Sequence, residues 1–235
     1  MSLSKKCCAE FLGTAALTFA ACGVAVIADD NSWWISTALA FGLVIVAMAY
    51  SIGNISGCHI NPAVSFAMAI SKRMTWKEFG AYVVSQIFGA FFGSGLLGLC
   101  LRKTFTTLGG NEIQDALKNE AGEIDKWSYL AAFAVEIILT FIFVMAILGV
   151  TDSRFHKGAK NPGLVIGLTL TLVHLVGLGF TGTSVNPARS IAPAVLQAIA
   201  KQSASLNQCW IWILAPMVGA ALAAGIYGSL TSEEK

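Results

Sequence analysis

The chain has 235 residues, of which 56% are hydrophobic and 12% are charged, and its mean hydropathy is +0.70. Soluble domains carry about 25% charged residues, so this composition excludes an ordinary soluble domain and predicts a protein of the lipid bilayer. The formal net charge of +2 says nothing about nucleic acid, and we expect no nucleic-acid partner. The six cysteines show no CxxC spacing and no nucleophile–base pair is evident, so we expect no metal, no cofactor and no enzymatic activity.

Six stretches are long and apolar enough to cross a bilayer, which takes about 20 residues. In chain order they lie at 6–28, 34–55, 79–101, 127–150, 162–180 and 208–230. The first follows Lys5 and Lys6 and looks superficially like a signal peptide. Its apolar run from Phe11 to Ala28 is longer than the roughly 7–15 residues of a signal core, so we predict a first transmembrane helix.

Two shorter apolar pieces remain, at about 61–71 and 186–199. From Trp33 to Ser71 the chain carries no charged residue apart from His59. One straight helix of that length would measure about 58 Å, nearly twice the hydrocarbon thickness. We therefore predict that the chain crosses, re-enters from the same side and turns back. Irregular backbone at that depth is tolerated only inside protein or beside a watery cavity, so the sequence predicts a pore.

The motif Asn61-Pro62-Ala63 recurs 125 residues later as Asn186-Pro187-Ala188. Asparagine at an N-cap followed by proline at the first helical position is a strong helix-start signal. A single copy could be only a helix start. Two matched copies inside uncharged sequence instead predict two half-helices that begin within the membrane, with their dipole-positive ends facing each other in a pore.

The two halves of the chain match beyond this motif, because the surroundings of Glu10 resemble those of Glu136. Each half holds three spans and one half-span, so the second half must be inverted relative to the first. The sequence predicts an all-α membrane protein of six transmembrane helices and two re-entrant half-helices. It forms one channel domain over 1–235, with repeats at about 5–101 and 127–230 and a connecting loop at 102–126.

The basic residues gather on one side of the expected membrane, and they comprise Lys5, Lys6, Lys72, Arg73, Lys77, Arg154, Lys157 and Lys160. The other side receives Asp29 and Asp30, the mixed connecting loop and Lys201. Basic loops stay in the cytoplasm, so we expect a multi-pass protein of the inner (plasma) membrane with both termini cytoplasmic.

Polar residues in the apolar segments are candidates for the pore. The side chains of Asn61 and Asn186 would cap their helices with the oxygen and keep N–H donors for water. Arg189 is the only arginine in an intramembrane segment, and such a charge is functional by default, although it could also extend to the headgroups. His174, taken alone, would more often be a packing histidine.

Glu10 and Glu136 are carboxylates near or inside the apolar cores. One interpretation is a proton relay. The alternative is structural, in which each carboxylate accepts hydrogen bonds from backbone N–H groups of a re-entrant loop. Their symmetric placement favours the structural role, because a coupling carboxylate would more plausibly be present once.

The paired Asn-Pro-Ala motifs, with Arg189 after the second, resemble the aquaporin or major intrinsic protein family, most of all its bacterial water-selective members. The resemblance covers nearly the whole chain, from Ala9 to about Tyr227. It implies a homotetramer in the lipid bilayer with one pore in each subunit and with water as the permeant.

In that family an aromatic/arginine constriction sets selectivity, and the resemblance maps it to Phe41, His174, Thr183 and Arg189. Phenylalanine with histidine implies an opening close to the size of water. Glycerol-conducting relatives have a smaller residue at the His position, an aromatic at the Thr position and Asp after the Arg. The family also implies a ladder of carbonyl acceptors along two loop strands, formed by Gly57, Cys58, His59 and Ile60 and by Gly182, Thr183, Ser184 and Val185.

Two departures from the family pattern stand out. Ile213 after Trp212 occupies a position where water-specific relatives have a second aromatic, and this favours solute-conducting members. Cys58 matches Thr183 in the other repeat, where relatives often have Gly or Ala. A thiol there would be a site for mercurial block.

The sequence therefore supports a passive water-selective channel. A channel of the same fold that also passes glycerol or other small neutral solutes is the first alternative. A proton-coupled transporter with Glu10, Glu136 and His174 as its relay is a second alternative, from another class. A structural membrane protein with a closed pore is a third, against which the intact polar filter argues.

Overall fold

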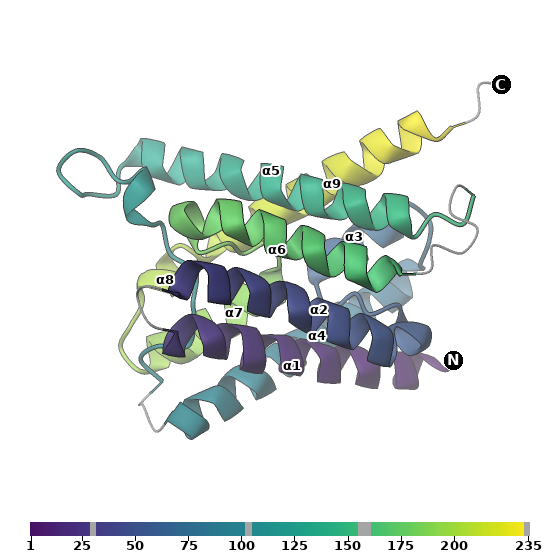
Figure 1. Ribbon diagram of the computed structural model, residues 1–235, viewed down its shortest axis with the longest axis horizontal. Helices are drawn as coiled ribbons and strands as arrows, with labels where there is room; N and C mark the ends of the chain where they lie inside the picture. Colours follow the sequence, from purple (N-terminus) through teal and green to yellow (C-terminus); the bar gives the residue numbers. More distant parts are fainter. Residues whose placement is uncertain (29–31, 102–104, 155–160, 233–235) are drawn as a thin grey trace.

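A computed structural model describes residues 1–28, 32–101, 105–154 and 161–232. Within these ranges the chain is helical, without strands, and six helices are long and apolar enough to cross a membrane. The six expected spans are thereby confirmed, with ends that move by a few residues. These helices are α1 (Leu3–Ile27), α2 (Trp33–Ser56), α4 (Trp76–Leu101), α5 (Lys126–Val150), α6 (Pro162–Thr181) and α9 (Cys209–Leu230) (Figure 1).

The two leftover apolar pieces form the short helices α3 (Pro62–Ile70) and α7 (Pro187–Ile199). Each starts at a proline that follows an asparagine N-cap. Two further single-turn elements, η1 (Asp115–Leu117) and α8 (Ala204–Asn207), were not expected from the sequence. Elements of three or four residues are too short to show a hydrophobic period, so no pattern could predict them.

Local sequence explains where the other helices begin and end. The carboxylate of Asp125 accepts hydrogen bonds from the backbone N–H groups of Trp127 and Ser128, which forms a capping box at the start of α5. Gly57 and Gly182 end α2 and α6 with left-handed backbone, at φ angles of 90° and 65°. Glycine takes this conformation without a steric penalty, so both helices stop where the re-entrant loops begin.

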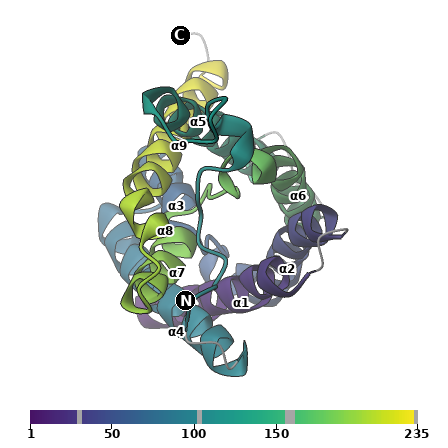
Figure 2. The ribbon, with the colours of Figure 1, turned by 90° about the vertical axis from the view of Figure 1, so that its left-hand side faces the viewer.

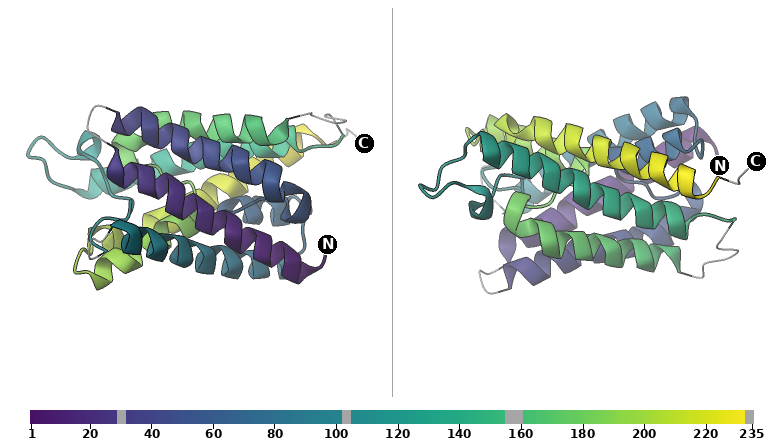
Figure 3. Two further views of the ribbon diagram at one scale, coloured as in Figure 1. Left: turned by 60° about the horizontal axis from the view of Figure 1, so that its bottom comes forward. Right: turned by 90° about the horizontal axis from the view of Figure 1, so that it is seen from above.

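The long helices surround the two half-helices and their loops, as the view along the bundle shows (Figure 2). Both chain termini lie at the same end of the molecule, which we call the terminal end (Figures 1 and 3). The connecting loop between α4 and α5 lies at the other end, which we call the loop end (Figure 1). The expected charges at Asp29, Asp30, Lys157 and Lys160 fall outside the described residues.

Close helix crossings depend on glycine. A Cβ atom added to Gly42 on α2 would lie 2.5 Å from the carbonyl oxygen of Gly167 on α6, and one added to Gly167 would lie 2.6 Å from the carbonyl oxygen of Gly42. Real Cβ atoms do not approach that closely. Backbone contact at small residues is typical of packing between membrane helices, since lipid supplies no hydrophobic force that pushes helices together.

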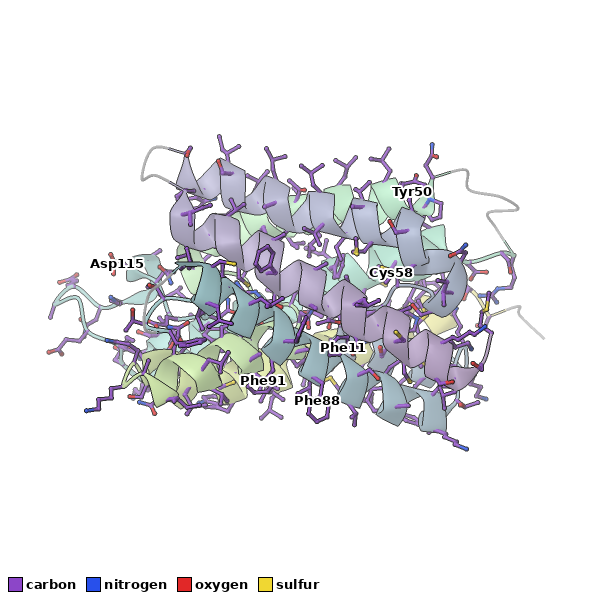
Figure 4. The ribbon with its side chains drawn as sticks, turned by 90° about the horizontal axis from the view of Figure 1, so that it is seen from below. Phe11, Tyr50, Cys58, Phe88, Phe91 and Asp115 are labelled. Carbon is purple, nitrogen blue, oxygen red and sulfur yellow. The ribbon has the colours of Figure 1, made fainter. Side chains whose placement is uncertain are left out.

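The exposed surface of the molecule carries many large apolar side chains, and polar side chains are buried in the interior among apolar clusters. Large apolar side chains such as Leu43, Phe88 and Leu99 are more than 60% exposed. Phe88 lies on the outer surface of α4 (Figure 4). Glu10 and Glu136, in contrast, are 0% exposed. This distribution suits a bilayer around the protein and a polar path within it.

Candidate functional site: a polar path between two half-helices

The N-terminal ends of α3 and α7 meet in the interior through their asparagine caps. The Oδ1 atom of Asn61 accepts a hydrogen bond from the backbone N–H of Ala63 at 2.8 Å, and its Nδ2 donates to the carbonyl of Val185 at 2.7 Å. Asn186 reciprocates, because its Nδ2 donates to the carbonyl of Ile60 at 2.9 Å. Each amide nitrogen carries two N–H donors, so one on each asparagine remains for another acceptor.

The re-entrant loops have left-handed backbone at matched positions. Besides the two glycine caps, φ is 52° at Cys58 and 47° at Thr183, and it is 40° at Ile60 and 46° at Val185. Branched residues rarely adopt this conformation, and each instance costs on the order of 1–3 kcal/mol. Strain repeated at the same positions of two loops indicates that the surrounding protein holds both loops in one required shape.

Glu10 holds the first loop. Its Oε1 accepts hydrogen bonds from the Ser56 hydroxyl at 2.7 Å and the His59 N–H at 2.9 Å. Its Oε2 accepts from the Ile60 N–H at 2.6 Å and from the side-chain amide of Gln86 at 2.7 Å. The carboxylate therefore satisfies two backbone donors that the left-handed turns leave without a helical partner.

Glu136 makes the equivalent contacts with the second loop. Its Oε1 accepts from the Thr181 hydroxyl at 2.7 Å and the Ser184 N–H at 2.8 Å, and its Oε2 accepts from the Val185 N–H at 2.8 Å. Such bonds are those of the structural alternative considered above. They also engage the oxygens that a proton relay would have to release.

Three of the residues assigned to the constriction form one cluster. The rings of Phe41 and His174 are stacked, with their centroids 4.2 Å apart and an interplanar angle of 19°. The guanidinium carbon of Arg189 lies 5.0 Å from the centroid of Phe41. All three side chains are at most 3% exposed, so the cluster lies inside the protein.

The histidine ring has a fixed tautomer. Its Nδ1 lies 2.9 Å from the carbonyl oxygen of Leu170, which can only accept, so Nδ1 carries the proton. Two buried atoms of this cluster, His174 Nε2 and Arg189 Nε, find no hydrogen-bond partner within the described part of the protein. Thr183 Oγ1 also lacks one, but Thr183 is not among the described residues that line the central cavity. A buried polar atom without a partner costs about 1–3 kcal/mol, so this group is suited to a small polar guest with both donors and acceptors.

The connecting loop reaches into the site, whereas the sequence predicts 102–126 only as a link between the repeats. The guanidinium of Arg189 donates to the carbonyl of Gly109 at 2.9 Å and to that of Gly182 at 3.4 Å. Asn111, which is fully buried, donates to the carbonyl of Thr181 at 3.1 Å and accepts from the Ser190 hydroxyl at 2.7 Å. The signal available in the sequence was Gly109-Gly110 followed by an asparagine, a turn composition inside a loop of mixed charge.

Three cavities that share lining residues follow one another through the molecule. A central cavity of about 10 Å³ is lined by both asparagines of the motif, Phe41, His174 and Arg189. It lies between a terminal-end vestibule of about 220 Å³, next to His59 and Cys58, and a loop-end vestibule of about 280 Å³, next to Arg189 and Gly109. A cavity of about 10–15 Å³ holds one water molecule, so the narrow part of the path has the dimensions of a single water.

The Trp212-Ile213 departure lies away from this path. Trp212 is fully buried and belongs to a hydrophobic cluster with Ala132 and Ile211. Ile213 packs against this cluster. Among the described residues, those that line the central cavity do not include Ile213. The expected bias toward larger solutes therefore has no direct contact through which to act.

These features define a class of protein: a multi-pass membrane channel in which two half-helices meet at a narrow central cavity. The family model described as "Major intrinsic protein" matches residues 1–227. The chain belongs to the major intrinsic protein family, and it is a channel and not an enzyme.

Relatives in this family carry two kinds of name. The chain is 36% identical to Aquaporin Z of Rhodopseudomonas palustris, over 98% of this chain and 95% of the relative. It is 40% identical to Glycerol uptake facilitator protein-like 6 of Lactiplantibacillus plantarum, over 98% of this chain and 100% of the relative. The X-ray structure of the aquaglyceroporin from Plasmodium falciparum superposes with a TM-score of 0.82 at 24% identity and covers 96% of each chain, which shows a shared fold.

Proposed function

We propose that this protein is a passive water-selective channel. The observation that carries the proposal is the buried cluster of Phe41, His174 and Arg189, with ring centroids 4.2 Å apart and the guanidinium carbon 5.0 Å from the phenyl ring. This cluster narrows the path and presents both donors and an acceptor. A water molecule offers two donors and two acceptor positions within that size.

Permeation follows from the order of polar groups along the path. In the constriction, water donates to Nε2 of His174 and accepts from the Arg189 guanidinium. At the centre, the second N–H groups of Asn61 and Asn186 hold the water oxygen and orient the molecule. These contacts replace bonds made in bulk water, so water crosses in single file in either direction and down an osmotic gradient.

Ions and protons are excluded by positive potential. The N-terminal ends of α3 and α7 meet at the centre, and each contributes about half of a positive elementary charge. Arg189 adds a full positive charge at the constriction. Cations and hydronium therefore meet an electrostatic barrier at two depths, whereas neutral water does not.

The topology proposal follows the distribution of basic residues. The terminal end, which carries Lys72, Arg73 and Arg154, faces the cytoplasm of a bacterial-type inner membrane, so α3 enters from that side. We further propose a homotetramer with one pore per subunit. Native mass spectrometry in detergent tests it, since the assembly should have four times the subunit mass of 24.7 kDa.

Glycerol permeation is the second candidate, and one finding favours it: the Lactiplantibacillus plantarum relative at 40% identity is named a glycerol uptake facilitator-like protein. The two candidate functions require constrictions of different size. The central cavity beside Phe41 and His174 has about 10 Å³, which is the room of one water molecule and less than a solute of six heavy atoms needs.

Stopped-flow light scattering of proteoliposomes separates these functions. With an impermeant osmolyte, a water channel accelerates shrinkage and lowers the activation energy toward that of diffusion in water. With glycerol, a water-selective channel shows no faster re-swelling than empty liposomes. Accelerated re-swelling would establish the glycerol function, and no acceleration in either experiment would contradict both.

A further inference from the structure

An open groove of about 560 Å³ lies at the terminal end, between the end of α3 and the last turns of α9. It is separate from the central cavity of the pore. Its lining includes the cations Lys72, Arg73 and Arg154 and the hydroxyl groups of Ser71, Ser229 and Thr231. Among the described residues that line it there is no carboxylate, so this described part of the groove is cationic and rich in hydrogen-bond donors.

A buried carboxylate positions the two arginines. Asp152 is 4% exposed, and its Oδ2 accepts from Arg73 at 3.0 Å, from Arg154 at 2.7 Å and from the Tyr227 hydroxyl at 3.0 Å. Among the described residues, Asp152 is the one carboxylate that contacts these two guanidinium groups, and Lys72 adds a third cation to the groove. The side chains of Arg73 and Arg154 are 24% and 56% exposed, so the cations are held in place without being fully covered.

Two glycines of α9 make room for the groove. Gly225 and Gly228 line it, and a Cβ atom added to either would meet nothing within 4 Å. Glycine inside a helix is destabilising by roughly 0.5–1 kcal/mol relative to alanine. Helix packing explains Gly42 and Gly167, but it does not explain this pair. Their missing side chains leave the hollow open beside the three cations.

An apolar stripe leads along α9 to the groove. Leu214, Val218 and Leu222 are 51%, 40% and 48% exposed. They precede Gly225 by eleven, seven and three residues, which places all four on one face of the helix. A ligand in the groove could therefore contact the cations at the end of α9 and the exposed apolar side chains along the preceding turns of the same helix.

We propose that this groove binds the phosphate headgroup of an anionic phospholipid, with an acyl chain along the stripe of Leu214, Val218 and Leu222. Arginine and lysine form charge-assisted hydrogen bonds to phosphate, and basic pockets at a membrane surface are suited to anionic headgroups. Free inorganic phosphate would use the same cations but not the stripe. A phospholipid, unlike free phosphate, therefore explains both the cationic groove and the apolar stripe.

Binding is measured by native mass spectrometry of the full chain in detergent, titrated with phosphatidylglycerol, phosphatidylcholine or inorganic phosphate. The carboxyl groups of Glu233 and Glu234, which follow Ser232 in the sequence, are then present. We expect phosphatidylglycerol to bind at least tenfold more tightly than either of the others. Equal affinity for phosphatidylcholine overturns the role of the cations, and equal affinity for inorganic phosphate overturns the lipid assignment.

Charge variants test the residues. The double variant K72Q/R154Q should weaken phosphatidylglycerol binding at least tenfold. The matched control is K201Q, since Lys201 follows α7 as Lys72 follows α3 and has the same left-handed backbone, with φ of 66° against 58°. K201Q should bind like the wild type. Unchanged binding by K72Q/R154Q, or an equal loss in K201Q, refutes the proposal.

A variant that fills the groove with a side chain distinguishes a loss of lipid binding from a loss of folding. G228F places a ring in the open groove and replaces a helical glycine, so it should abolish lipid binding while the melting temperature stays the same or rises. G80F is its control, because Gly80 on α4 also has nothing within 4 Å and does not line the groove. Retained lipid binding in a well-folded G228F protein contradicts the proposed site.

Discussion

The imidazole of His174 has two nitrogens in different surroundings, and the difference sets its role. Nδ1 is fixed by the carbonyl of Leu170, whereas Nε2 is buried and has no partner among the described residues. The ring therefore presents one acceptor beside the donors of Arg189. A histidine in an apolar helix was ambiguous from the sequence, and the stacking on Phe41 is the contact that places it in the constriction.

The first prediction enlarges that constriction. In the double variant H174G/T183F the imidazole is removed and its space opens, while the phenyl ring replaces the small polar group at position 183. We expect the variant to accelerate glycerol re-swelling of proteoliposomes at least tenfold over the wild type. A variant that conducts water and still excludes glycerol would mean that the filter has been misplaced.

The second prediction concerns Cys58, which borders the terminal-end vestibule and is partly exposed. A mercury ion on its thiol would obstruct the path below the central cavity. We expect mercuric chloride to reduce osmotic water permeability several-fold and C58S to remove this block. C100S, which changes an exposed cysteine, should remain sensitive. Undiminished inhibition of C58S would rule out this site.

At the scale of elements, the half-helices depend on partners from both halves of the chain. The asparagine and proline pair predicts each helix start from local sequence alone. The strain at Ile60 and Val185 has no local signal, because valine and isoleucine normally avoid positive φ. Tertiary hydrogen bonds impose it: Glu10 and Glu136 lie far from these loops in the sequence, so no window of neighbouring residues contains both the donor and the acceptor.

The third prediction tests this support with E136Q. The amide keeps an acceptor for the Ser184 N–H but turns an NH₂ group toward the Val185 N–H, so one buried donor loses its partner. This should lower stability by about 1–3 kcal/mol and reduce water permeability. The control E120Q removes the same charge from an exposed position and should change the melting temperature little.

The relay alternative predicts a different outcome for E136Q. A carboxylate that carried protons would be replaced without loss of folding, and only transport driven by a pH gradient would change. Melting in detergent and permeability in proteoliposomes, measured on the same preparation, distinguish the two cases. An unchanged melting temperature would count against the structural role.

On the scale of the whole molecule, six spans, two half-helices and the order of elements could be predicted, because length, hydropathy and the Asn-Pro starts are all local signals. The connection at the loop end could not. Gly109 and Asn111 contact Arg189, Thr181 and Ser190 across about 70–80 residues of sequence. The contacts of Asp152 at the terminal end were equally hidden, since they join the ends of three helices that only the fold brings together.

The fourth prediction uses the pH dependence of that terminal-end contact. The hydrogen bond from the Arg154 side chain is the main reason that the pKa of Asp152 is held well below its ordinary range. A carboxyl group whose pKa is lower in the folded protein stabilises the fold at pH values above its pKa in the unfolded chain, which is about 3.9 for aspartate. This stabilisation is lost as the pH falls from that value toward the pKa of the folded protein.

The wild type should therefore melt higher than D152N by a constant margin between pH 8 and about pH 5, and this margin should shrink only below about pH 4. Thermal melting of both proteins in detergent across this range provides the comparison. D115N is a control, because the Asp115 side chain is 96% exposed in its ion pair with Lys118. A margin that already closes near pH 6 would contradict the assignment to Asp152.

The reciprocal hydrogen bonds from each asparagine to the opposite re-entrant loop have a consequence for biosynthesis. Asn61 donates to Val185 and Asn186 donates to Ile60, so each half of the chain supplies the acceptor for the other. A ribosome adds about 5–20 residues per second, so the acceptor for Asn61 is made about 6–25 s after the asparagine itself. During that interval the first re-entrant loop can be held only by its own half of the chain, for example by the hydrogen bonds that Glu10 accepts from the His59 and Ile60 N–H groups. The nascent first half therefore stays in the membrane without the acceptor for Asn61, and the rate of translation sets how long it remains in this incomplete state.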